Sequence, residues 1–209
     1  MQVKKPNFYS VIIGTELLNG RRKDAHFAFL NQQLLSRGWE QKASFVIADD
    51  TNLMENIFNL IKSDPNSVMF CFGGIGATPD DYTRVVAANV FTNGKMEFHE
   101  EAKSRIINQF KDEAYPHRIN MAHLPINAKL LTNVVNNVAG FYLEDRFFFT
   151  PGFPSMSQAM VIEALDKLYP KSNIEKYRKV MTINASENDL IDTMKKIPLH
   201  IELSSLPKI

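Results

Sequence analysis

Residues 68–84 constrain the fold of this chain more than any other part of the sequence. The stretch begins with five consecutive apolar residues, 68–72, which is typical of a strand buried on both faces of a parallel sheet. Three glycines follow this strand: Gly73, Gly74 and Gly76. Because glycine has no Cβ, the backbone can turn tightly here and point several N–H groups into one space. We call residues 73–78 the glycine turn.

The residues after the glycines predict the start of a helix. Threonine caps helices and proline suits the first helical position, so Thr78 and Pro79 predict that start, and Asp81 completes a box-like Thr-x-x-Asp pattern. A strand, a glycine turn and a helix N-terminus in this order form a site for a phosphate group, because the positive end of the helix dipole faces the turn.

Two carboxylates, Asp80 and Asp81, stand next to this predicted phosphate site, although carboxylate and phosphate repel each other. A divalent cation such as Mg²⁺ removes the conflict, because it takes hard oxygen ligands from both groups. The alternative is that the two acids only favour the helix dipole, which is worth about 0.3–1 kcal/mol each. The residues alone leave both interpretations open.

Composition excludes several classes of function. Lysine and arginine number 24 against 23 acids, so the chain has no electrostatic footprint for nucleic acid or for an anionic membrane. No apolar stretch nears the roughly 20 residues that a membrane span needs, and no signal peptide is evident. The single cysteine, Cys71, lies in the apolar strand and is expected to be a buried thiol. We therefore expect a cytoplasmic, soluble protein.

The first part of the chain alternates strands and helices. Strands are expected at 8–13, 44–48 and 68–72, with a helix from Asp24 to Ser36 and another from residue 51 or 52. The residues expected to face inward from these two helices are Phe27, Leu30, Leu34, Leu53, Ile57, Leu60 and Ile61. This alternation predicts a parallel sheet covered by helices on both faces.

The later part of the chain predicts further elements in the same layers. We expect helices at 100–114 and 155–168, the latter with Met160, Ile162 and Leu165 inward, and short strands at 129–132, 140–143 and 146–150. A linker near 171–173 separates a domain of residues 1–170 from an appendage of residues 171–209. In the appendage we expect a strand at 180–183, a helix at 187–196 and a strand at 199–203.

Polar residues follow the predicted strands where ligands bind in open α/β sheets. Gly14, Thr15 and Glu16 come after the first strand, and Asp49 comes after the second. Glu16 is equally well explained as a solvated loop residue, and Asp49 as the cap of the next helix. Neither familiar phosphate motif is present, because the third glycine of a dinucleotide fingerprint would fall at Pro79 and no Gly-Lys-Ser/Thr occurs.

These motifs together resemble the molybdopterin-binding (molybdenum cofactor biosynthesis) domain family. The resemblance is closest to the N-terminal domain of the competence/damage-inducible protein A family. The matching segments are residues 14–20, Asp24, Asp49, 73–84, 121–125, Asn133, 140–141, 151–155, 186–187 and 204–207. They span most of the chain.

The resemblance implies a three-layer α/β sandwich with a mostly parallel central sheet, plus a short, truncated C-terminal α+β appendage. It implies that a nucleotide or a pterin is held through its phosphates. The implied binding residues are Gly14, Thr15, Glu16, Gly73, Gly74, Gly76, Thr78, Pro151 and Gly152. It also implies catalytic roles for Asp49 and Asp81, a divalent metal at Asp80 and Asp81, and self-association as a dimer or trimer.

The implied activity is metal-dependent hydrolysis of a nucleotide pyrophosphate such as ADP-ribose or FAD. The alternative is a non-catalytic pterin or nucleotide binding protein linked to molybdenum cofactor biosynthesis. Four departures from the family pattern bear on this choice: Thr15 replaces Asp, His26 replaces Asn, Ala77 replaces Pro, and Met156 replaces Glu. The changes at Thr15 and Met156 favour the alternative.

Overall fold

The computed structural model of the protein describes residues 5–172, 177–198 and 200–206. The chain divides into two compact units, Met1–Glu175 and Lys176–Ile209, and we describe each by itself. Within the described residues, no helix combines the length and the apolar character that crossing a bilayer requires.

The first unit is built on a six-stranded sheet with the strand order β2-β1-β3-β8-β7-β6. Its strands are β1 (Asn7–Ile13), β2 (Gln41–Ile47), β3 (Ser67–Phe72), β6 (Lys129–Leu131), β7 (Gly140–Leu143) and β8 (Phe147–Thr150). The neighbours from β2 to β8 are parallel, whereas β7 and β6 are antiparallel to their neighbours. The prediction of a mostly parallel sheet is confirmed.

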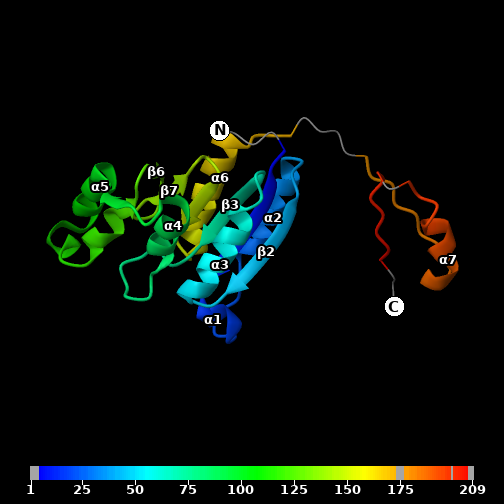
Figure 1. Ribbon diagram of the computed structural model, residues 1–209, viewed down its shortest axis with the longest axis horizontal. Helices are drawn as coiled ribbons and strands as arrows, with labels where there is room; N and C mark the ends of the chain where they lie inside the picture. The colour runs from blue at the N-terminus through cyan, green and yellow to red at the C-terminus, as the bar shows by residue number, and fades with distance from the viewer. Residues whose placement is uncertain (1–4, 173–176, 199, 207–209) are drawn as a thin grey trace. The chain divides into compact units, whose positions relative to one another are not determined.

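Helices cover both faces of this sheet and make the three predicted layers (Figure 1). One face packs against α2 (His26–Ser36) and α6 (Pro154–Leu168), and the other against α3 (Thr51–Lys62) and α4 (Thr83–Thr92). Helix α5 (Glu100–Phe110) packs instead against the two 3₁₀ helices described below. Alternate residues of β3 enter the two cores, so that Phe70 lies in one and Cys71 in the other. Burial raises the pKa of the Cys71 thiol, as expected for a structural cysteine.

The helices face the core differently from the prediction in three places. Leu53 and Leu60 of α3 are exposed, and the buried residues are Met54, Phe58 and Ile61. Two of the predicted inward residues are therefore confirmed, because Ile61 is buried and Ile57 packs against the core, whereas Met54 and Phe58 lie one residue, about 100°, around the helix from the predicted positions. Two apolar stripes lie side by side there. The stripe that packs into the core is the one that contains Phe58. Phe27 of α2 and Ile162 of α6 are also exposed.

A small arm beside the sheet was not predicted. It consists of the antiparallel strands β4 (Met96–Phe98) and β5 (His123–Pro125), with the 3₁₀ helices η1 (Lys111–Ala114) and η2 (Arg118–Ala122). The helix expected to reach residue 114 ends at Phe110, since Lys111 has a φ of 51°. Strands of three residues are too short to show an alternating pattern in the sequence.

The second unit contains a single helix in its described residues, α7 (Glu187–Met194). Ser186 and Asp189 form a capping box at its start, so the expected helix is present but ends before residue 196. The strand expected at 180–183 does not form, and residues 200–203 of the strand expected at 199–203 are not in a strand either. Leu199, the first residue of that last expected strand, lies outside the described residues.

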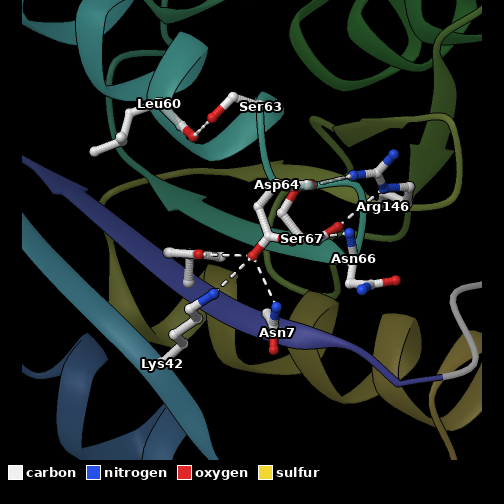
Figure 2. Close-up of polar contacts among 9 residues, drawn as sticks. Asn7, Lys42, Leu60, Ser63, Asp64, Asn66, Ser67 and Arg146 are labelled. Carbon is white, nitrogen blue, oxygen red and sulfur yellow. Dashed lines mark hydrogen bonds and ion pairs between the residues drawn. The ribbon is translucent and has the colours of Figure 1, made fainter.

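The edge of the sheet where the parallel strands begin is held by one carboxylate, Asp64 (Figure 2). Its Oδ2 accepts hydrogen bonds from Asn7 Nδ2 and the Tyr9 hydroxyl, both 2.8 Å, and from Lys42 Nζ at 3.0 Å. Its Oδ1 accepts from the Asn66 N–H at 2.9 Å. Burial alone would raise the pKa of this carboxyl, but the four donors outweigh burial and hold the pKa well below its usual range.

Arg146, directly before β8, closes the same edge. Its guanidinium donates to the backbone carbonyls of Ser67 and Asp64, at 2.9 and 3.1 Å. The starts of β1, β2, β3 and β8 are thus tied together by hydrogen-bonded polar groups, although Oε1 of Gln41, the first residue of β2, is buried without a partner in the described part of the chain.

We predict that Asp64→Asn lowers the free energy of unfolding by about 2 kcal/mol, the usual range for hydrogen bonds to a charged group. The amide cannot satisfy the three donors at Oδ2 and the Asn66 N–H together. Since the folded-state pKa is depressed, this stabilisation is complete above the unfolded pKa of about 3.9 and is lost as the pH falls below it. Urea titrations between about pH 7 and pH 3 measure both effects.

The matched control is Asp166→Asn. Asp166 pairs with Arg37 but its side chain is 62% exposed, so the change is expected to stay within about 0.5 kcal/mol. Equal losses in the two variants would contradict the role assigned to Asp64.

Candidate functional site

The four parallel strands end at one edge of the sheet, which we call the carboxyl edge. The predicted residues that follow these strands are Gly14 and Thr15 after β1, Asp49 after β2, Gly73 after β3, and Pro151 and Gly152 after β8. The Gly14 N–H donates to the Ile47 carbonyl at 3.0 Å, and the Gly73 N–H donates to the Thr150 carbonyl at 2.9 Å. The structure therefore brings these residues together at the carboxyl edge.

Gly73 is the tightest point of this edge. Its φ of 103° is unfavourable for any residue with a Cβ, and an added Cβ would lie 2.6 Å from the Ile13 carbonyl oxygen. On the other side, a Cβ on Gly152 would lie 3.3 Å from the Gly73 Cα. The ends of β1, β3 and β8 are in contact here because glycines stand at the point of closest approach.

The next part of the glycine turn is held by the start of α4. The Thr83 hydroxyl donates to the Gly73 carbonyl at 2.9 Å, and the Thr83 N–H donates to the Gly74 carbonyl at 3.0 Å. Gly74 has a φ of 69°, and a Cβ there would overlap the Thr83 hydroxyl. Thr83 was not identified from the sequence, although it follows the glycines at close range.

The predicted helix start at Thr78 and Pro79 is wrong, because α4 begins at Thr83. Residues 78–81 instead form a turn in which the Thr78 N–H donates to Asp81 Oδ2 at 2.8 Å and the Thr78 hydroxyl donates to the same oxygen. Asp80 and Asp81 are consequently not helical residues, but Asp81 directly precedes Tyr82, the N-cap of α4, so the dipole explanation stays open. This turn connects the glycines to the start of α4 at Thr83.

Arg84 fixes the turn from the interior. Its guanidinium is buried and donates to the carbonyls of Ile75 and Gly76. Burial lowers the pKa of Arg84, and the charge of Asp81 partly offsets that shift. The hydrogen bonds of Arg84 to these two carbonyls therefore shape the loop.

The turn leaves backbone donors unused. Considering only the described part of the chain, the N–H groups of residues 74–77 donate to no protein acceptor. Ile75 is buried and the other three residues are half-buried. These four neighbouring N–H groups, two to five residues after the end of β3 at Phe72, offer donors of the kind that bind phosphate oxygens.

Asp49 is closely tied to Thr15. The Thr15 N–H and hydroxyl donate to Asp49 Oδ2 at 2.8 and 2.9 Å. The alternative role of Asp49 as a helix cap is wrong, because Asp50 caps α3 by accepting from the Leu53 N–H at 2.8 Å. Thr15 therefore occupies one oxygen of the acid to which the resemblance assigned a catalytic role.

A small pocket opens beside Gly14, under a short helix, α1 (Thr15–Leu18), where the sequence predicted a loop. Its polar lining includes Glu16, Arg22, Lys23, Asp24, His26 and the backbone of Gly152. The distance from an Arg22 guanidinium nitrogen to Glu16 Oε1 is 3.5 Å. The Arg22 guanidinium carbon lies 5.2 Å from the centre of the exposed Phe153 ring. Arg22 and Lys23 were not predicted as site residues, although residues 21–23 are a run of three basic residues in the sequence.

His26 forms the inner wall of this pocket. Its ring stacks on Phe72 at 4.4 Å between centroids, with Nε2 3.3 Å from the Gly152 carbonyl and Nδ1 3.4 Å from the Ser157 hydroxyl. Burial lowers its pKa, although the Gly152 carbonyl and Asp24 act in the opposite direction. A neutral His26 thus joins the start of α2 to the end of β8 and the start of α6.

The other departures from the family pattern lie outside the lining of this pocket. Met156 Sδ is 4.0 Å from Asn136 Nδ2, in the loop between β6 and β7. Ala77 is part of the glycine turn, among the residues with unused N–H groups.

The acids at the carboxyl edge do not form a complete metal centre. Among the residues that the structure describes, no three acidic, histidine or cysteine side chains are placed to hold one ion. Magnesium is usually held by one or two carboxylates together with ligand phosphates and waters. Asp80 and Asp81 beside the glycine turn fit that second arrangement, in which the ion arrives with a diphosphate.

The fold and this edge define the chain as a three-layer α/β domain with its candidate ligand site at the carboxyl ends of parallel strands. Residues 10–170 match a protein-family model described as a probable molybdopterin binding domain. The match covers well over half of the chain, so the chain belongs to this family.

Within the family, the chain is close to CinA-like proteins. One from Leptospira biflexa serovar Patoc is 30% identical over 213 residues, which cover 90% of this chain and 50% of that protein. The crystal structure of CinA from Thermoplasma acidophilum, a protein of unknown function, matches with a TM-score of 0.69 and 24% identity, over 77% of this chain and 97% of that one. This chain spans about half the length of the Leptospira relative.

A more distant structure confirms the same fold. The molybdopterin biosynthesis enzyme MoaB from Thermus thermophilus matches with a TM-score of 0.50 and 13% identity, over 78% of this chain and 91% of that one. At such identities, the two structures show the fold alone.

We predict that Thr15→Asp makes the stability of the protein depend on divalent metal. The substitution places a second carboxylate against Asp49 Oδ2 and removes the hydroxyl that donates to it. Two carboxylates at this distance cannot both stay ionised without a proton or a cation between them. Chemical denaturation at about pH 8 is expected to show a loss that millimolar Mg²⁺ reverses.

The matched control is Thr15→Val, which removes the hydroxyl without adding charge. It is expected to cost about 1 kcal/mol, independently of Mg²⁺. If Mg²⁺ affects both variants alike, Asp49 and residue 15 do not form a cation site.

Proposed function

We propose that this domain binds a phosphorylated pterin or nucleotide at the carboxyl edge. The observation that carries the proposal is the set of unused N–H groups at residues 74–77, next to a pocket lined by Arg22 and Lys23. Gly152 links the two, because it lines the pocket and packs against Gly73. The phosphate is assigned to the glycine turn, and the ring system of the ligand to the pocket side.

The pocket chemistry suits a flat, polar ring. The Phe153 ring is exposed beside Arg22, so it offers a stacking surface, and Glu16 offers a carboxylate acceptor for ring amino groups. The family model supports a pterin, because its description names molybdopterin. A nucleotide has the same combination of phosphate and amino-substituted heterocycle.

As the activity of this site, we propose metal-dependent hydrolysis of a nucleotide pyrophosphate of the ADP-ribose or FAD type. Asp81 stands at the glycine turn, where Thr78 holds its Oδ2 with two hydrogen bonds; a Cβ on Gly76 would lie 3.2 Å from its Oδ1, so Oδ1 is the oxygen assigned to the cation. A diphosphate at the turn therefore meets this carboxylate, and a divalent cation between them relieves the repulsion. Water would attack one phosphorus, the P–O–P bond would break, and two monophosphates would leave.

The alternative is binding without turnover, and one observation favours it. Thr15 holds Asp49 Oδ2 with two hydrogen bonds, which weakens Asp49 as a general base or a metal ligand. Adding ADP-ribose or FAD with several divalent metals and measuring AMP separates the two. AMP formation supports the hydrolase, and tight binding without AMP supports the binding protein.

For binding, we predict that Arg22→Gln weakens the affinity for ADP-ribose by about tenfold, the loss expected for one hydrogen bond or ion pair to a charged ligand group. Calorimetric titration measures it. The matched control is Arg21→Gln, because Arg21 bonds to Asn19 and does not line the pocket. Equal affinities in the two variants would place the ligand elsewhere.

For the metal, we predict that Asp81→Asn removes most of the Mg²⁺ dependence of ADP-ribose binding and of any AMP release. The amide oxygen can take the place of Oδ2 and accept from the Thr78 N–H and hydroxyl, so the turn is kept while the charge is lost. Titrations with and without Mg²⁺ on both proteins test this. An unchanged Mg²⁺ dependence would assign Asp81 to shaping the turn and nothing more.

A further inference from the structure

The sequence contains two Asn-Gly pairs, Asn19-Gly20 and Asn93-Gly94, and each follows a helix of the first unit, α1 or α4. Asparagine before glycine is prone to spontaneous loss of its side-chain amide, because glycine has no Cβ to keep its backbone nitrogen away from the asparagine side chain. The hydrogen bonds around the two pairs differ in ways that bear on this reaction.

The attacking nitrogen is held weakly in the first pair and firmly in the second. The Gly20 N–H donates to the Leu17 carbonyl at 3.4 Å, which is long for such a bond, whereas the Gly94 N–H donates to the Ala88 carbonyl at 2.9 Å. A Cβ on Gly20 would meet no heavy atom within 4 Å, so the backbone has room to rotate there. The Gly20 nitrogen therefore reaches the side chain before it at lower cost than the Gly94 nitrogen does.

The side-chain carbonyl of Asn19 is polarised by Arg21. Asn19 Oδ1 accepts hydrogen bonds from the Arg21 backbone N–H at 3.2 Å and from the Arg21 Nε–H at 3.1 Å. Negative charge develops on this oxygen when a nucleophile adds to Cγ, and two donors, one of them cationic, stabilise such charge as an oxyanion hole does. In the part of the chain that the structure describes, no donor is bonded to Asn93 Oδ1.

We propose that Asn19 is a site of spontaneous deamidation, and that the fold makes it react faster than Asn93. The Gly20 nitrogen loses its proton and bonds to Asn19 Cγ, the Cγ–Nδ2 bond breaks, and ammonia leaves with that proton. Water then opens the resulting succinimide ring at either of its carbonyls. The product is an aspartate at position 19, or an isoaspartate in which the main chain runs through Cβ and Cγ.

The product changes the wall of the ligand pocket, a consequence that rests on the proposed function. Residues 19–22 connect α1 to Arg22, whose N–H donates to the Glu16 carbonyl at 3.0 Å. An isoaspartate lengthens this connection by one main-chain carbon, and either product adds a carboxylate beside Arg21 and Arg22. Both changes compete with a phosphorylated ligand for Arg22.

The test compares amide loss at the two pairs in one sample of the full chain, held at mildly alkaline pH and followed by mass spectrometry of tryptic peptides. Trypsin cleaves after Arg21 and after Lys95, so the two pairs fall in different peptides. Asn19 is expected to lose its amide at least about tenfold faster than Asn93, from the weaker bond at its nucleophile and the two donors at its oxygen. In concentrated urea this difference should vanish, because the fold causes it.

Arg21→Met isolates the polarising contact, because methionine keeps a long side chain without a donor. It is expected to slow amide loss at Asn19 by about fivefold to tenfold. Asn93, in the same molecule, serves as the control and should be unaffected. Equal rates at the two pairs in the folded protein, or a rate at Asn19 that Arg21→Met leaves unchanged, would overturn the proposal.

Ligand affinity is measured separately, on fresh and incubated protein. Incubated wild type is expected to bind ADP-ribose about tenfold more weakly than fresh wild type, the loss expected for Arg22→Gln. Incubated Asn19→Gln should keep its initial affinity, because the longer side chain closes the ring slowly. Equal affinities of fresh and incubated wild type would overturn the effect on the pocket. No binding by the fresh protein would overturn the proposed function, and the peptide masses would still decide whether Asn19 is modified.

Discussion

The contact of three chain segments at Gly73 determines the geometry of the carboxyl edge. With a φ of 103° and no Cβ, this residue passes between the Ile13 carbonyl and the backbone of Gly152. A side chain at this point would separate the ends of β1, β3 and β8. The residues that follow those strands would then lose their common position. The glycine turn and the pocket lined by Gly152 both depend on this close approach.

The polar groups at the carboxyl edge differ from those at the opposite edge, where the strands begin, in whether they have hydrogen-bond partners within the chain. At the edge where the strands begin, Asp64 accepts four hydrogen bonds and Arg146 donates to two carbonyls, so these two side chains have their partners within the chain. At the carboxyl edge, the N–H groups of residues 74–77 have no acceptor within the described residues, and two cations line the neighbouring pocket. Half-buried polar groups without partners are costly, so they persist where a ligand completes them.

The sequence predicted the layers and the edge well, because those features depend on local patterns. The unbroken apolar run of β3, the glycines after it and the Asp24 carboxylate that accepts from the His26 and Phe27 N–H groups are all encoded within a few residues. The turn between β7 and β8 is also local, since Glu144 and Asp145 both adopt positive φ angles, 54° and 58°.

The errors occurred where distant contacts decide between local options. Thr78 and Pro79 have the composition of a helix start, but Thr83 and Arg84 hold the preceding carbonyls and move that start forward to Thr83. The face of α3 depended on which of two apolar stripes fitted the sheet. The pocket required knowing that Arg22 and Gly152, 130 residues apart, meet at the same edge. In the C-terminal unit, strand patterns without a partner strand did not form strands.

The central claim is that the carboxyl edge, and not the opposite edge, binds a phosphorylated ligand. The most direct measurement is backbone amide NMR of the ¹⁵N-labelled chain during titration with ADP-ribose and with inorganic pyrophosphate. The account predicts that the largest shifts with pyrophosphate occur at residues 74–77, that ADP-ribose adds shifts at Arg22, Lys23 and Gly152, and that Asn66 and Ser67 beside Asp64 do not move. Shifts confined to the Asp64 edge, or no saturable shifts at residues 74–77, would contradict it.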